Sequence, residues 1–142
     1  MTWGVTLSAA MVSCSADDSG NILTISYVNQ VKAGQVELCR RTIRDQMKHL
    51  KPGFALLVDL THMESMDAEC AESLGAMIEL CSSREMAVAV WVVPDPSKDI
   101  GLNLIARFHC WQPVRTHTRS NLAEAMKCLM LERAAMAETP RV

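Results

Sequence analysis

The sequence predicts one α/β domain with a mixed, mostly parallel sheet and flanking helices, and three observations favour this class. Residues 54–58 and 86–93 are continuously apolar, as strands are when helices cover both of their faces. After a first hairpin, segments with helical spacing alternate with strand-like segments, which indicates parallel strands joined by right-handed crossovers. The length of 142 residues suits a single domain with a substantial core.

A hairpin and a helix are expected in the first third of the chain. Residues 5–14 are moderately apolar, and residues 17–21 form a strong turn signal. Residues 22–28 then alternate apolar and polar side chains, as a half-buried strand does. Apolar residues recur at helical spacing from residue 36 to residue 50, and Lys51-Pro52-Gly53 ends this helix.

The middle of the chain predicts two central strands around a second helix. The first strand covers residues 55–60, and a polar loop over residues 61–67 follows it. Asp67 stands where the N-cap of the helix should be. The second strand lies within residues 86–93. The apolar stripe of the helix consists of Ala71, Leu74, Ile78 and Cys81.

The last third predicts a short helix, a short strand and a final helix. Pro94-Asp95-Pro96 forces a turn, and Ser97 is the expected N-cap of a helix with Gly101, Leu104, Ile105 and Phe108 on one face. A strand over residues 114–118 precedes a helix that Asn121 and Glu124 start. Its expected apolar face is Leu122, Ala125, Met126 and Leu129. The order is β-β-α-β-α-β-α-β-α, with the core within about residues 7–131 and a fraying tail over 132–142.

Composition and charge exclude several classes of protein. Fourteen basic residues face 16 acidic ones, and the net charge of -2 gives no electrostatic reason to expect nucleic acid as the main partner. The start of the chain lacks the basic residues of a secretory signal, and the longest apolar run, residues 86–94, is too short to span a bilayer. We therefore expect a cytoplasmic protein without a membrane partner.

Six cysteines occur without any Cys-x-x-Cys pair, which predicts reduced and mostly buried thiols rather than disulfides. The chain also lacks a Walker loop, a Gly-x-Gly-x-x-Gly motif and a Gly-x-Ser-x-Gly motif. The sequence therefore predicts no cofactor and no enzyme activity.

The order of elements resembles the STAS domain, the fold of bacterial anti-sigma factor antagonists and of the cytoplasmic tails of sulfate transporters. The resemblance covers residues 7–131, and uncharacterised bacterial STAS-like proteins look similar. It implies a regulatory protein partner, of which a kinase-type anti-sigma factor is one candidate, and it is compatible with a homodimer. The segments that carry it are Leu57-Val58-Asp59-Leu60, Met66-Asp67, Met86-Ala87-Val88-Ala89-Val90 and Ser120-Asn121-Leu122-Ala123-Glu124-Ala125-Met126.

The chain departs from that family at the regulatory motif. Asp67-Ala68-Glu69-Cys70 stands where the family has Asp, two hydroxyl residues and Gly. The resemblance implies that a partner kinase phosphorylates the second hydroxyl, whose position carries Glu69 here. A carboxylate cannot be phosphorylated and mimics a phosphate only in part, because a phosphate carries about -1.5 to -2 charges.

Two loops form the predicted partner-binding surface. Parallel strands end at one edge of a sheet, where open α/β folds usually bind their ligands. Helix starts also present free N–H groups, and those beside Lys98 are a candidate anion site. The alternative is that these residues only cap and stabilise helix starts. The predicted binding residues are Ser65, Asp67 and Glu69 in the first loop and Ser97, Lys98 and Asp99 in the second.

Three other functions compete with this prediction. Asp59, with Asp17-Asp18 as an acidic pair, superficially resembles the phospho-acceptor site of receiver domains, although the initial hairpin disagrees with their topology. The residues Cys70, His109 and Cys110 and the other histidines, His49, His62 and His117, include usual nucleophile and metal-ligand types, but their spacing supports neither role. A pocket for a small apolar ligand or lipid is the third alternative. It would use methionines that otherwise fill the core: Met66, Met77, Met86, Met126 and Met130.

Overall fold

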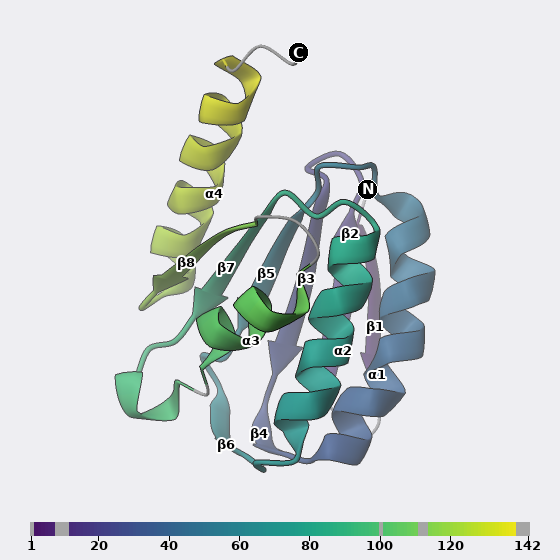
Figure 1. Cartoon of the computed structure of the whole chain (residues 1–142), viewed down its shortest axis with the longest axis vertical. Helices are drawn as coiled ribbons and strands as arrows, with labels where there is room; N and C mark the ends of the chain where they lie inside the picture. Colours follow the sequence, from purple (N-terminus) through teal and green to yellow (C-terminus); the bar gives the residue numbers. More distant parts are fainter. Residues whose placement is uncertain (1, 8–11, 100, 111–113, 139–142) are drawn as a thin grey trace.

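A computed structural model describes residues 2–7, 12–99, 101–110 and 114–138 of the chain (Figure 1). The strands are β1 (Thr2–Leu7), β2 (Val12–Asp17), β3 (Ile22–Tyr27), β4 (Asn29–Val31), β5 (Ala55–Asp59), β6 (Met63–Met66), β7 (Val88–Val92) and β8 (Arg115–Arg119). The α-helices are α1 (Ala33–Gln46), α2 (Cys70–Ser83), α3 (Leu102–His109) and α4 (Leu122–Glu138). Two 3-10 turns, η1 (Met47–His49) and η2 (Pro96–Lys98), complete the described elements.

The main sheet has six strands in the order β1-β2-β3-β5-β7-β8. The first three strands pair antiparallel, whereas β3, β5, β7 and β8 pair parallel. A second, two-stranded parallel sheet joins β4 to β6. This topology confirms the predicted mixed, mostly parallel sheet of an α/β fold.

Helices cover the two faces of the main sheet unequally. α1, α2 and α3 pack on one face around the larger core, and among the described helices α4 alone packs on the other face (Figure 1). The strands β5 and β7 are buried on both faces, as their continuous apolar sequences predict, because they lie between these helix layers. Alternate residues of each strand therefore enter different cores: Leu56, Val58, Ala89 and Trp91 on the α2 side, and Ala55, Leu57, Val88 and Val90 on the α4 side.

The buried cysteine thiols are unreactive. Cys14, Cys39, Cys70 and Cys81 lie inside the larger core and form no disulfide, as the sequence predicts. Burial raises the pKa of the Cys14 thiol to about 12 and that of Cys39 to about 11. Both side chains therefore stay protonated near neutral pH and are poor nucleophiles.

The N-terminal half contains more strands than the sequence predicts. Residues 5–14, expected as one strand, belong to β1 and β2, which run antiparallel to each other, and the residues between them lie outside the described ranges. The hairpin with alternating burial is β2 with β3. The short strands β4 and β6 were missed because three or four residues give no measurable period.

Two helices expose apolar side chains that the sequence assigned to packed faces. In α3, the buried residues are Leu102 and Ala106, whereas Leu104 and Phe108 are exposed. In α4, Ala125, Cys128 and Leu129 face the core, and Leu122, Met126 and Met130 lie outside it. Met77 and Met86, by contrast, fill the core as expected. The predicted fraying tail is also wrong at its start, because α4 continues to Glu138.

The end of α2 offers a simple test of backbone strain. The Met86 N–H donates to the Cys81 carbonyl and the Glu85 N–H to the Ser82 carbonyl, which is the hydrogen-bond pattern of a Schellman motif. Glu85 occupies its left-handed position with φ 65°, which glycine adopts without steric cost. We expect Glu85→Gly to raise the free energy of unfolding by about 0.5–1 kcal/mol, as measured by urea denaturation. A destabilised variant would contradict this geometry.

Candidate functional site

The candidate site lies beyond the edge at which the parallel strands end. The chain leaves β3 through Val28 and enters β4 at Asn29, which adopts a positive φ of 62°. It leaves β5 through a turn in which the Asp59 carboxylate accepts the Thr61 N–H at 2.9 Å, and then forms β6. The pairing of β4 with β6 therefore extends the fold past the main sheet and places Ser65, an exposed residue of β6, on that extension (Figure 1).

The start of α2 differs from the prediction at Asp67. The N–H of Asp67 donates to the Val31 carbonyl at 3.1 Å, which continues the β4–β6 pairing through this residue. The Asp67 carbonyl then accepts the Cys70 N–H at 3.0 Å in a turn, so that the helix begins two residues later than expected. Glu69, not Asp67, occupies the N-cap position, and its side chain makes no capping hydrogen bond.

Four exposed carboxylates gather along β6 and the first turn of α2, and we name this set the acidic rim: Glu64, Asp67, Glu69 and Glu72. In the described part of the chain, none of these side chains forms a hydrogen bond or an ion pair. The positive end of the α2 dipole favours acids here, but it compensates only a fraction of one charge. The acidic rim is therefore a negative surface available to solvent or a partner.

The second predicted loop is a rigid turn. The Asp95 carboxylate accepts the Ser97 N–H at 3.0 Å and the Ser97 hydroxyl at 2.8 Å, so Asp95 rather than Ser97 is the capping residue, and it caps η2. These hydrogen bonds hold the pKa of the Asp95 carboxyl below its ordinary value. The Asp99 carboxylate accepts the Gly101 N–H at 2.9 Å, just before α3. Because these N–H groups already have acceptors, they do not form the anion site that the sequence suggested.

Lys98 connects the two loops. Its Nζ donates to the Met63 carbonyl of β6 at 3.3 Å, which holds residues 96–99 against the strand that carries Ser65. In the described structure, no hydrogen bond or ion pair joins Asp67 or Glu69 to Ser97 or Asp99. A hollow of about 40 Å³ between the two loops is little larger than one water molecule. This arrangement suits a contact surface better than a small-molecule site.

The receiver-like alternative fails on geometry. Asp17 ends β2, which runs antiparallel to β3, and the strand register aligns it with Ile22 and so with Ala55 at the start of β5. Asp59 ends β5 at the opposite edge of the sheet. The separation of about 13 Å along the strand keeps the acidic pair far from the supposed phospho-acceptor.

The histidines that might have formed a metal or nucleophile site make other contacts. His109 Nδ1 lies 3.4 Å from a Glu79 carboxylate oxygen, and its ring packs on Gly75, where an added Cβ would lie 2.4 Å from Nε2. This close contact seats α3 on α2. Among the described residues, no group of three or more His, Cys, Asp or Glu side chains could hold a metal ion.

No helix in the described part of the chain is long and apolar enough to cross a membrane.

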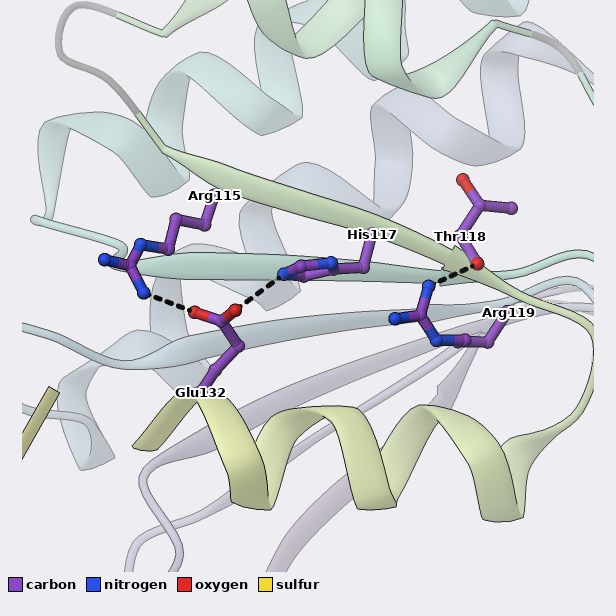
Figure 2. A network of polar contacts seen from close by, with 5 residues as sticks. All are labelled: Arg115, His117, Thr118, Arg119 and Glu132. Atoms are coloured by element: carbon purple, nitrogen blue, oxygen red, sulfur yellow. Dashed lines mark hydrogen bonds and ion pairs between the residues drawn. The ribbon is translucent and has the colours of Figure 1, made fainter. Parts of the chain in front are cut away.

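A polar network between β8 and α4 was not predicted. The half-buried Glu132 carboxylate accepts from Arg115 at 3.0 Å and lies 2.9 Å from His117 Nε2 (Figure 2). Arg119, the third basic residue of the strand, donates instead to the Thr118 carbonyl at 2.8 Å. The alternation Arg-Thr-His-Thr-Arg could have indicated a basic strand face, because alternate residues share a face. The acidic partner of this strand face, Glu132, lies beyond residues 7–131, the range that the sequence analysis assigned to the core.

This network acts as a clamp between the last strand and the last helix. Partial burial opposes ionisation of Glu132, but the hydrogen bonds from Arg115 and His117 outweigh it and hold the pKa of the carboxyl below its ordinary value. Within the described residues, no hydroxyl or thiol hydrogen-bonds to His117. The contacts therefore support a structural role.

Comparisons with known proteins identify the fold of this chain. No protein-family model matches the sequence, and no curated protein matches it. An uncharacterised protein of the DUF3478 family with a SpoIIAA-like fold, from Shewanella loihica PV-4, is similar with a TM-score of 0.60 and 11% identity, over 91% of this chain and 95% of that chain. An anti-sigma factor antagonist from Mycobacterium paratuberculosis gives a TM-score of 0.54 and 17% identity, over 87% and 99% of the two chains.

A third solved structure, the anti-sigma factor antagonist SpoIIAA in its unphosphorylated form, gives a TM-score of 0.50 and 13% identity, over 94% of this chain and 98% of that chain. The chain therefore has a SpoIIAA-like, STAS-like fold, which confirms the fold that the sequence resemblance implied. Because the sequence identities are this low, no residue role is transferred from these proteins to this chain. The candidate site is supported by the geometry of this chain alone.

Proposed function

We propose that this chain is a non-enzymatic regulatory module that binds a protein partner through the acidic rim and the adjoining residues 96–99. The observation that carries the proposal is the exposed acidic rim, which forms no ion pair with any described residue and stands at the edge where open α/β folds recognise their ligands. The fold likeness to two anti-sigma factor antagonists supports a regulatory class. The expected partner presents a basic surface, because complementary charge favours encounter and orientation.

Glu69 gives this surface a permanent charge. In the family that the sequence resembles, a hydroxyl residue at this position receives a phosphate, whereas the Glu69 carboxylate is always present and cannot be added or removed. The exposed N-cap position leaves the side chain accessible to a partner. The proposed module therefore binds without an on-off control by phosphorylation at this residue.

Affinity capture from native cell extract tests the proposal. We expect wild-type protein immobilised on a column to retain a specific partner and Glu69→Lys to lose at least nine-tenths of it, because the substitution replaces an attractive charge with a repulsive one. Retained proteins are identified and quantified by mass spectrometry.

Glu124→Lys is the matched control. Glu124 is also an exposed glutamate in the first turn of a helix, but it lies on α4, on the opposite face of the sheet. Both substitutions place a lysine near a positive helix end and cost similar stability. Equal retention by wild type and Glu69→Lys would exclude this surface as the binding site.

A further inference from the structure

A second charged surface, opposite in sign to the acidic rim, lies on α1. Between residues 32 and 51 the chain carries six basic and two acidic residues, a net charge of +4. The whole chain has a net charge of -2, so the remaining residues carry -6. The positive charge of this protein is therefore concentrated on one helix and its flanks.

Both acidic residues of α1 are already paired. Glu37 forms an ion pair with Arg40, and Asp45 lies 3.6 Å from Lys48 Nζ. The exposed guanidinium groups of Arg41 and Arg44 have no such partner among the described residues. Like charges three residues apart on a helix repel each other, and although the negative end of α1 favours Arg44 in its last turn, no described acidic side chain compensates the charge of Arg41.

The two unpaired arginines border a hollow. A shallow depression of about 520 Å³ is lined by Gly34, Glu37, Leu38, Arg40, Arg41 and Arg44. Leu38 is 58% exposed at this surface, which leaves an apolar contact beside the charges. Arg41, Arg44 and Lys48 follow one another at helical spacing over about 10 Å, the length of two helical turns. We name Arg41, Arg44 and Lys48 the basic ridge. The depression therefore has the apolar Leu38 side chain beside Arg41 and Arg44 of this ridge.

We infer that Arg41 and Arg44 bind an acidic segment of a partner protein, with Leu38 contacting an apolar side chain of that segment. Guanidinium groups prefer carboxylates and phosphates because their planar N–H donors match both oxygens of such a group. Two features favour a peptide over nucleic acid. The exposed Leu38 side chain cannot form a favourable contact with a phosphate backbone. The residues outside 32–51 carry a net charge of -6, which repels any polyanion that extends beyond the ridge. This surface is separate from the acidic rim and selects a partner of opposite charge.

Fluorescence anisotropy with a labelled synthetic peptide of alternating Glu and Leu tests the inference. We expect the wild type to bind this peptide at low salt, and Arg41→Ala/Arg44→Ala to bind at least tenfold more weakly. Alanine is the strongest helix former, so the double variant keeps α1, which circular dichroism verifies. Arg107→Ala/Lys127→Ala removes the same charge from exposed positions on α3 and α4 and should bind within twofold of wild type.

Each remaining outcome overturns the assignment. Equal binding by Arg41→Ala/Arg44→Ala, or no binding by the wild type, would show that the ridge is not a docking site. Equal binding of a Gln-Leu peptide would show that the negative charge of the peptide does not determine binding. Tighter binding of a single-stranded DNA of the same total charge would reassign the surface to nucleic acid. Glu69→Lys should bind the Glu-Leu peptide at least as well as wild type, which separates this test from that of the acidic rim.

Discussion

Replacing Trp91 by alanine is expected to lower the free energy of unfolding by about 3–5 kcal/mol. Trp91 lies on β7 and is 1% exposed within the larger core. Its indole N–H donates to the Asn103 side chain of α3 at 2.5 Å, and Asn103 in turn donates to the Thr118 hydroxyl of β8 at 3.4 Å. The substitution removes the packing of a large ring and this link between three elements. Chemical denaturation monitored by circular dichroism measures the loss.

Trp91→Phe separates packing from hydrogen bonding. A phenyl ring fills most of the site but cannot donate to Asn103, so we expect a loss of only about 1–2 kcal/mol. Because Asn103 fixes α3, which follows residues 94–99, both substitutions should also loosen the second binding loop. A Trp91→Ala variant as stable as Trp91→Phe would show that the site collapses around the missing ring and that our account of this core is wrong.

Replacing Glu132 by glutamine is expected to cost about 1–2 kcal/mol at neutral pH. The change preserves the shape of the side chain but removes the charge that Arg115 and His117 contact (Figure 2). Most of the effect should come from His117, because Arg115 is 60% exposed and its ion pair is screened by solvent. Urea denaturation of wild type and Glu132→Gln in parallel gives the difference.

The same pair of proteins should show a defined pH dependence. The pKa of Glu132 lies below its ordinary value of 4.5 in the folded protein, so its stabilising contribution is present above pH 4.5 and is lost as the pH falls through the folded value. We therefore expect the stability difference between wild type and Glu132→Gln to be constant above pH 4.5 and to shrink as the pH falls below that value. A difference that does not shrink at any acidic pH at which both proteins still fold would contradict the ionised clamp.

Local sequence patterns were sufficient to predict the central strands and most helices. The runs at residues 54–58 and 86–93 are apolar at every position because both faces of β5 and β7 are covered, and this pattern is visible without any knowledge of tertiary contacts. The Asn121 cap was also predictable, since its side chain accepts the Glu124 N–H at 2.8 Å within the same turn.

The errors arose where distant segments determine local structure. Asp67 is not a cap because its N–H bonds to Val31, which lies on β4. Glu132 continues α4 because Arg115 and His117 of β8 hold it, and composition gives no sign of that contact. Phe108 and Leu104 follow helical spacing but remain exposed, because Leu102 and Ala106 already fill the contact with the core. The predicted binding loops are adjacent through Lys98, but their role as a partner surface stays a prediction.

Photo-crosslinking shows whether a partner protein binds along the acidic rim. A photoreactive amino acid is placed at Ser65, which is exposed on β6 beside the acidic rim, or at Ala123, which is exposed on α4. After irradiation in native cell extract, we expect a discrete protein adduct from position 65 that Glu69→Lys abolishes, and none of the same mass from position 123. An adduct that forms equally from both positions, or only from position 123, would contradict the proposed surface.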